Sequence, residues 1–342
     1  MILLVLSTSL IFGLIVTGFL YQWIGGRRDR VRFTSDGRWV DIGNGRRLYL
    51  IEKGTGGRTV VFESGIAATN LNWFRIQQAV SSFTATASYD RGGLGWSSPC
   101  RSARTPANIA AELHTMLQRA GIKPPYVLVG HSFGGLVMRR FALSHPDEVL
   151  SLILVDPMRC EEWPPVNPSQ QAAVDRGDRL AGIAIPVARL GVARLATTSL
   201  LCRSGRMSRW LAGAGGDGAQ HVLGRVREEI GKMPREIWPI VAAHWSRPDF
   251  YAGMRQHVKA VPDTVREMRD APPIRDIPIL VLTPDKSKPL SDECLRRIGE
   301  NVRQVIVPQS GHWIHLDQPD RVIDWVRTVV EEACSQPLAL TT

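Results

Sequence analysis

A short apolar run that breaks into a glycine-flanked serine constrains the fold of this chain more than any other segment. Residues 126–129 read Tyr-Val-Leu-Val, as in a buried strand, and residues 130–134 continue with Gly-His-Ser-Phe-Gly. This motif after a strand is typical of a sharp turn into a helix, at which the serine takes a sparsely populated backbone conformation. The flanking glycines leave room for that turn. The sequence therefore predicts that Ser132 stands at the end of a sheet, with a helix over residues 136–144 behind it.

Three further segments carry the other groups that a serine-based site needs. The strand-like run 59–63 ends in a loop at Ile66 whose backbone N–H groups can face an anionic oxygen. Downstream, an apolar strand ends at Asp156, and another strand-like run, residues 302–307, precedes His312. Serine, aspartate and histidine thus follow one another in the order that an α/β-hydrolase topology imposes on its triad.

At these residues the chain resembles the α/β-hydrolase superfamily, and the likeness extends over roughly residues 40–333. Two more pieces of the likeness are residues 89–97, similar to the family's strand-to-loop segment before the serine, and residues 310–312 with the trailing Asp-Gln-Pro at 317–319. The resemblance implies an α/β-hydrolase fold with a mostly parallel sheet flanked by helices and a helical cap inserted after the strand that ends at Asp156. Alternating predicted strands and helices agree with such a sheet.

Each residue of the motif has a chemical role in this interpretation. A serine hydroxyl is a weak nucleophile, so Ser132 needs His312 to take its proton and to return it to the leaving group. The N–H groups of Phe133 and Ile66 are the expected oxyanion hole. Haloalkane dehalogenases and epoxide hydrolases of the superfamily carry an aspartate at the turn, so a serine there favours an acyl-enzyme route.

The acid of the triad has two candidates. Much of the superfamily places it after the strand that here spans residues 278–283, where this chain offers Asp285 without the family's preceding glycine. Asp156 lies directly at the end of a clean apolar strand, a position that some members use. We favour Asp156 and keep Asp285 as the alternative. His131 and His315 are interpreted as residues that pack or orient the loop.

The remaining organisation follows from composition shifts along the chain. Gly43-Asn44-Gly45 between two short strands predicts a hairpin. The segment 157–270 holds Trp163, Trp210, Trp238 and Trp245 and shows no convincing strand, so we interpret it as a helical cap in which the tryptophans pack. The predicted units are an anchor at 1–26, a core at 36–156 and 271–334 with the cap at 157–270 between its two parts, and a tail at 335–342.

The first segment differs from all others. Residues 2–24 carry no charge and, at about 1.5 Å per residue, are long enough to cross a hydrocarbon layer of about 30 Å. Tyr21 and Trp23 stand near its end and four arginines follow between 27 and 32. No basic residue precedes the run and no small-residue cleavage site follows it, so we expect a single-pass anchor in the cell membrane rather than a cleaved signal peptide. The arginines favour a cytoplasmic catalytic domain.

Net charge, motifs and cysteine spacing indicate which partners, cofactors and metals to expect. The net charge is +10, but residues 27–58 hold nine Arg or Lys against four Asp or Glu, so half of the excess lies beside the predicted anchor. No nucleic-acid-binding pattern is present, and we expect no nucleic-acid partner. We expect neither cofactor nor metal, because the sequence has no phosphate loop or ligand spacing. The cysteines show no Cys-x-x-Cys pair; they are Cys100, Cys160, Cys202, Cys294 and Cys334.

The sequence thus predicts a membrane-anchored serine hydrolase, of the carboxylesterase or lipase kind, that cleaves small ester-type substrates through an acyl-enzyme. An apolar cap and an anchor favour lipophilic esters. Two alternatives stay open. One is a non-catalytic ligand-binding or signalling member of the same fold, since fold does not fix activity. The other is a cofactorless haloperoxidase-like enzyme with the same triad.

Overall fold

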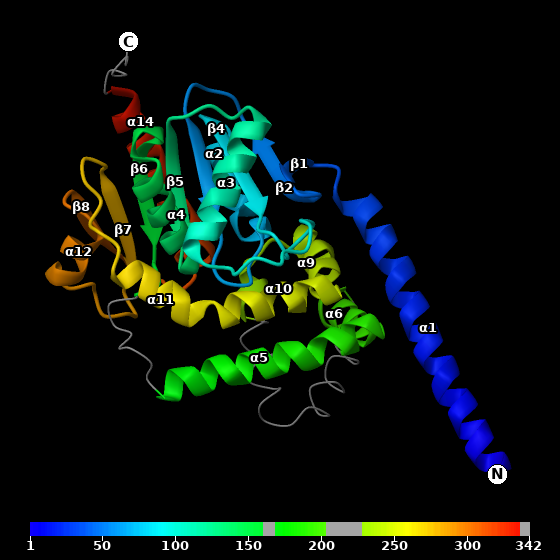
Figure 1. The fold of residues 1–342 in the computed structure, drawn as a ribbon. Coiled ribbons are helices and arrows are strands. Elements are labelled where there is room, and N and C mark those ends of the chain that lie inside the picture. The colour runs from blue at the N-terminus through cyan, green and yellow to red at the C-terminus, as the bar shows by residue number, and fades with distance from the viewer. Residues whose placement is uncertain (160–167, 203–227, 336–342) are drawn as a thin grey trace.

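A single eight-stranded sheet organises the chain, of which the computed structural model describes residues 1–159, 168–202 and 228–335 (Figure 1). The strand order is β1-β2-β4-β3-β5-β6-β7-β8, antiparallel among the first three and parallel from β4 to β8. The strands are β1 (Arg38–Gly43), β2 (Arg46–Lys53), β3 (Thr59–Glu63), β4 (Ala85–Asp90), β5 (Tyr126–His131), β6 (Val149–Val155), β7 (Ile279–Pro284) and β8 (Val302–Val307). This is the predicted fold class: an α/β-hydrolase sheet, mostly parallel and flanked by helices.

Helices cover both faces of the sheet. The principal ones are α1 (Ile2–Phe33), α2 (Phe74–Val80), α3 (Pro106–Ala120), α4 (Phe133–Ser144), α5 (Pro168–Arg189), α6 (Val192–Cys202), α9 (Trp238–Trp245), α10 (Pro248–Lys259), α11 (Val261–Arg269), α12 (Asp292–Ile298), α13 (Ile314–Asp317) and α14 (Pro319–Ser335). α3 and α4 pack on one face and α2 and α14 on the other, each pair through a cluster of buried apolar side chains. The inner strands are therefore apolar on both faces, which explains the continuous apolar run of β5.

The segment between β6 and β7 is helical wherever the structure describes it. It contributes α5, α6, α9, α10 and α11, which lie together beyond one edge of the sheet in Figure 1, and its described residues include no strand. Trp238 and Trp245 are half-buried among these helices, as expected of packing residues. Trp163 and Trp210 lie outside the described residues. We call these helices the cap.

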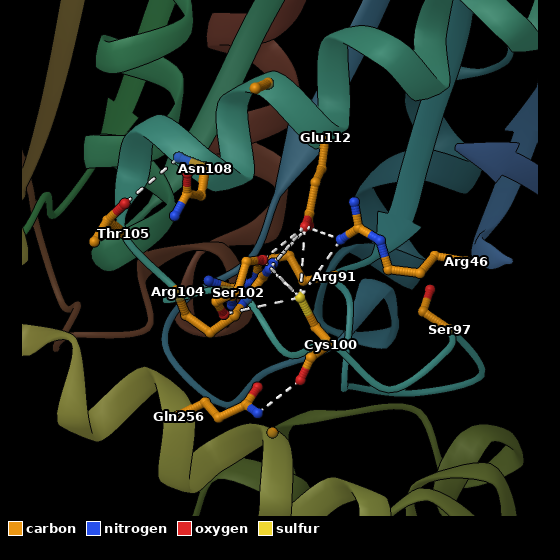
Figure 2. A network of polar contacts seen from close by, with 12 residues as sticks. Arg46, Arg91, Ser97, Cys100, Ser102, Arg104, Thr105, Asn108, Glu112 and Gln256 are labelled. Atoms are coloured by element: carbon orange, nitrogen blue, oxygen red, sulfur yellow. Dashed lines mark hydrogen bonds and ion pairs between the residues drawn. The ribbon is translucent and has the colours of Figure 1, made fainter. Parts of the chain in front are cut away.

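The cap meets the core at a close joint between α10 and the loop after β4. A side-chain Cβ at Gly253 of α10 would come within 2.3 Å of the Gly93 carbonyl oxygen, so the two backbones touch there. Gln256 Nε2, also on α10, donates to the Cys100 carbonyl at 2.6 Å (Figure 2). The joint therefore depends on a glycine in the cap helix, because any other residue would push the helix away.

A buried charge cluster supports the core side of this joint. Glu112 of α3 accepts from Arg46 at 2.5 Å and from Arg104 at 3.0 Å (Figure 2). Burial by itself raises the pKa of the Glu112 carboxyl, but Arg104 and Arg46 outweigh it and the net shift of the pKa is downward. The loop that faces the cap is thus fixed by an ionised carboxylate held between two guanidinium groups.

Two elements differ in extent from the sequence prediction. The N-terminal helix continues past the apolar run to Phe33, and α4 begins at Phe133 rather than at residue 136, because a single residue makes the turn after β5. The predicted hairpin is present, with positive φ at Gly43, Asn44 and Gly45.

One buried histidine of the cap predicts a pH-dependent stability. His244 of α9 packs edge-on against Trp96, with ring centroids 4.7 Å apart, and neither ring nitrogen has a hydrogen-bond partner among the described residues. Burial, followed by the nearby Arg247, lowers the pKa of His244 to about 3. An unfolded histidine titrates near pKa ~6.5, so between these values the unfolded chain binds one more proton than the folded chain.

Stability should therefore fall as pH falls below about 6.5. For His244 we expect a loss of about 3 kcal/mol in the free energy of unfolding between pH 7 and pH 4, on the order of 1.4 kcal/mol per pH unit. His244→Leu should remove that part of the pH dependence. Denaturant unfolding at both pH values measures it, and a variant with the same loss as the parent protein would contradict the prediction.

Candidate active site

Ser132 occupies the turn between β5 and α4 in a strained conformation. Its φ of 53° and ψ of −120° are unusual for a residue with a side chain, and such a backbone costs on the order of 1–3 kcal/mol. A Cβ at Gly130 would lie 2.6 Å from the Gly134 carbonyl oxygen, and one at Gly134 would lie 2.5 Å from that of Ser64. Both glycines of the motif are therefore required by backbone contacts, which explains their presence around the serine.

The neighbouring strand β6 holds this turn. Ser132 donates its N–H to the Val155 carbonyl at 3.0 Å, and its own carbonyl accepts from Met158 N–H at 3.2 Å. In the parallel pairing of β5 with β6, His131 lies opposite Val155. Since both strands end at the same edge of the sheet, Ser132 and Asp156 are brought to that edge together.

His312 is bound to Asp156. Its Nδ1 lies 2.7 Å from Asp156 Oδ2, and the histidine side chain is 46% exposed while that of the aspartate is 12% exposed. Asp156 has a positive φ of 40°, so its backbone is strained where the carboxylate turns toward the histidine. A carboxylate on Nδ1 fixes the proton there and leaves Nε2 as the basic nitrogen. The structure thus brings together His312 and the favoured acid candidate.

Asp285, the alternative acid, contacts the backbone of the loop before His312 instead. Its carboxylate accepts from Gln309 N–H at 2.7 Å and from Ser310 N–H at 3.1 Å. The Gln309 amide is the main reason that the pKa of Asp285 is lowered, and the Ser310 amide adds to it. Gln309 itself has a φ of 56°. Asp285 therefore shapes the loop that carries His312, and the structure records no contact between the two side chains.

His131 and His315 pack beneath the same loop. His131 Nε2 donates to the His312 carbonyl at 2.8 Å, and its ring centroid lies 4.3 Å from that of His315. His315 in turn packs on Trp73 at 4.7 Å. Burial, with His312 as the next cause, lowers the pKa of His315 to about 3, and burial lowers that of His131 as well. Two neutral imidazoles therefore support the His312 backbone.

The loop after β3 places the other expected oxyanion donor beside the serine. Ile66 is 38% exposed and Phe133 is buried, and neither backbone N–H has an acceptor among the described residues. Ala67 has a φ of 57°, so this loop too is strained. A Cβ placed at Gly65 would lie 3.6 Å from Ser132 Cβ, which shows how closely the loop approaches the serine.

A buried ion pair that sequence inspection did not single out supports this loop. Arg91 donates to the Gly65 carbonyl, lies 3.4 Å from Glu63 Oε1 and faces the Phe133 ring at 5.2 Å. Tyr89 donates its hydroxyl to Glu63. Burial raises the pKa of Glu63, and Arg91 is the first group to oppose that shift. The sequence signal that could have indicated this pair is the position of two charged residues, Glu63 at the end of β3 and Arg91 directly after β4.

One group of potential metal ligands lies far from this site. His114, His145 and Glu148 present ligand atoms within 4.8 Å of one another, at the end of α4 opposite Ser132. The His114 and His145 rings are stacked, and His114 Nε2 lies 3.0 Å from Glu148 Oε1. The described residues around Ser132 contain no such group.

Comparisons with known proteins agree with this architecture. The chain is 32% identical over 105 residues to the uncharacterized protein YqjL of Bacillus subtilis, covering 31% of this chain and 42% of that protein. It is 35% identical over 122 residues to the dihydrolipoyllysine-residue acetyltransferase component of the acetoin cleaving system of Cupriavidus necator, covering 35% of this chain and 32% of that protein. The chain thus spans less than half the length of these curated relatives.

Solved structures show the same fold over most of the chain. An epoxide hydrolase, CorEH, aligns with a TM-score of 0.63 and 16% identity over 86% of this chain and 98% of its own. A thermophilic esterase of Thermogutta terrifontis aligns with a TM-score of 0.60 and 20% identity over 87% and 99%. The family model described as "Alpha/beta hydrolase family" matches residues 60–325. On this match, together with the sheet order and the serine turn, the chain belongs to the alpha/beta hydrolase family.

Proposed function

We propose that this protein is a serine hydrolase that cleaves carboxylic esters through an acyl-enzyme, with Ser132, His312 and Asp156 as its triad. The observation that carries the proposal is the 2.7 Å bond from His312 Nδ1 to Asp156, at the sheet edge where Ser132 turns out of β5. A histidine held this way has one free basic nitrogen. The other parts of the proposed site are a strained, half-buried serine as nucleophile and, beside it, the N–H groups of Phe133 and Ile66, which have no acceptor among the described residues.

The proposed reaction has two halves. Ser132 Oγ attacks the ester carbonyl carbon while His312 Nε2 takes the hydroxyl proton, and the N–H groups of Phe133 and Ile66 bind the resulting oxyanion. The tetrahedral intermediate expels the alcohol, which receives the proton from His312. Water then attacks the acyl-enzyme with His312 as the base. The carboxylic acid departs, and Ser132 regains its free hydroxyl. Asp156 stabilises the imidazolium in both halves.

The nucleophile separates this proposal from the epoxide hydrolase to which the fold is similar. Opening an epoxide through an alkyl-enzyme ester calls for a carboxylate at the turn, whereas this chain has a hydroxyl there. A serine hydroxyl with a histidine base is suited to acyl transfer. Esters are therefore the favoured substrates, and the arrangement resembles an esterase in its chemistry.

We also propose that α1 anchors the protein in the cell membrane, with the catalytic domain on the cytoplasmic side. The helix has 32 residues, and its most apolar 18-residue window has a mean hydropathy of 2.4 and is not buried against the rest of the chain. Arginines follow that window, as the positive-inside tendency requires of a cytoplasmic flank. A membrane-bound esterase meets lipophilic esters at high local concentration, which makes them the proposed substrate class.

Covalent labelling tests whether the site is catalytic. A fluorophosphonate probe should label the full chain in detergent or vesicles, because an activated serine hydroxyl attacks phosphorus as it attacks a carbonyl. Ser132→Ala should abolish the label, while Ser82→Ala, at an exposed serine before the N-terminal end of β4, should retain it. An unlabelled parent protein would favour a non-catalytic, ligand-binding member of the fold.

Two asparagine substitutions test the choice of acid. Asp156→Asn should reduce kcat for a p-nitrophenyl ester by about 10³- to 10⁴-fold, since His312 would lose the partner that fixes its tautomer. Asp285→Asn should cost about tenfold or less, because one of its two hydrogen bonds to the loop is lost while His312 keeps its bond to Asp156. Steady-state kinetics on both variants decides the matter. The reverse order of effects would make Asp285 the acid.

A series of p-nitrophenyl esters tests the substrate class. We expect kcat/KM to rise from the acetate to medium-chain esters by up to about fourfold for each added methylene. That factor corresponds to the ~0.8 kcal/mol of free energy gained when one methylene is buried. Rates measured below the solubility limit of each ester provide the comparison. A preference for the acetate would contradict the assignment to lipophilic esters.

A further inference from the structure

The N-terminal helix is packed against the cap over its second half. A Cβ at Gly18 would lie 2.4 Å from the Leu190 carbonyl oxygen, and one at Gly25 would lie 2.7 Å from the guanidinium of Arg194. Arg194 of α6 donates to Gln22 Oε1 at 3.0 Å and to Asp29 Oδ2 at 2.6 Å. Glycines thus permit close approach, and a buried arginine fastens the two parts together.

A cavity of about 420 Å³ lies between α1 and the cap beside this contact. Four of its lining residues are arginines: Arg27 and Arg30 from α1, and Arg189 and Arg247 from the cap. The lining contains one carboxylate, Asp249, which is paired with Arg247 at 3.0 Å. The other three guanidinium groups have no ion pair with any described residue, so the cavity carries an excess of positive charge.

The cavity lies at the depth of the lipid headgroups if α1 spans the bilayer as proposed. Counting from Ile2 at about 1.5 Å per residue, positions 18–23 are about 24–32 Å along the helix, at the far border of a hydrocarbon layer of about 30 Å. Phe19 and Trp23 of that stretch line the cavity, and aromatic side chains prefer this border. Arg27 and Arg30 follow directly outside it.

The adjoining surface of the cap is apolar at the same depth. α5 and α6 meet at a bend of 93° around Leu190 and Gly191, and Gly191 lies against Gly18 and Tyr21 of α1. Several large apolar side chains of these two helices are exposed; they are Leu180, Ile183, Val187, Leu190, Val192 and Leu195. The opposite side of α5 packs on α10 through Gly177 and Gly182. The cavity therefore borders a surface suited to acyl chains.

We propose that this cavity binds the phosphate headgroup of an anionic phospholipid. A planar guanidinium group can bind two phosphate oxygens at once, and three of those here have no carboxylate partner among the described residues, Arg27 being stacked on Trp23 at 4.1 Å. Phe19 and Trp23 contribute apolar walls for the first carbons of the lipid, and the exposed residues of α5 and α6 receive its chains. The inference rests on the proposed membrane span of α1 but not on catalysis, because no residue of the proposed triad lines the cavity.

Native mass spectrometry of lipid retained by the full chain tests the site. The protein is reconstituted into vesicles of equal phosphatidylcholine and phosphatidylglycerol and released in mild detergent. We expect bound phosphatidylglycerol to exceed phosphatidylcholine several-fold, and Arg30→Gln with Arg189→Gln to reduce that ratio at least fivefold. Arg28→Gln with Arg179→Gln removes the same charge from the same two helices outside the cavity, and should leave the ratio unchanged.

The outcomes separate this site from the proposed function. Equal ratios of bound phosphatidylglycerol to phosphatidylcholine in the two double variants would overturn the headgroup site. The site would also be overturned if inorganic phosphate bound the lipid-free protein through Arg30 and Arg189 while the protein in vesicles showed no lipid preference. A chain that does not remain with the vesicles would overturn the anchor and the site together. Ser132→Ala should retain the lipid preference, so a failure of catalysis leaves this result intact.

Discussion

Parallel pairing of β3, β5 and β6 is the constraint on which the site depends. Each of these strands ends at the same edge of the sheet, and each end carries one component: the Ile66 loop, Ser132 and Asp156. The components are far apart in sequence and meet because the backbone ladder fixes their register. His312 follows β8, three strands along the sheet from β5, and the short loop at 308–311 that Asp285 shapes carries it toward Asp156.

Backbone strain is concentrated around this edge. Among the described residues other than glycine, positive φ occurs at Ala67, Ser132, Asp156 and Gln309 near the site, and elsewhere at Asn44 and Asp276. Strain of this kind persists only where the surroundings enforce it. The buried pair of Arg91 and Glu63 and the backbone contacts of the two motif glycines provide that enforcement. Stability elsewhere in the core thus maintains an unfavourable backbone geometry at the candidate site residues.

Much of the fold could be predicted from the sequence, because the inner strands are apolar runs and the turn motifs are local. The choice between Asp156 and Asp285 could not be predicted. Both are carboxylates at strand ends, and their hydrogen-bond partners come from a loop more than twenty residues away. The supporting pair of Glu63 and Arg91 was equally hidden, because burial of a charge depends on tertiary packing. The length of α1 was underestimated from the sequence. Arg194 binds its charged half at Asp29, and because the two residues are 165 positions apart this contact does not show in the local sequence.

The attachment of α1 has a mechanical consequence. The helix is clamped to the cap by Arg194, and at its C-terminal end Phe33 packs against Tyr49 and Trp96 of the core. If α1 spans the bilayer as proposed, these contacts hold the cap and the core at one orientation to the lipid surface. The helix therefore ties both parts of the chain to the membrane rather than one of them.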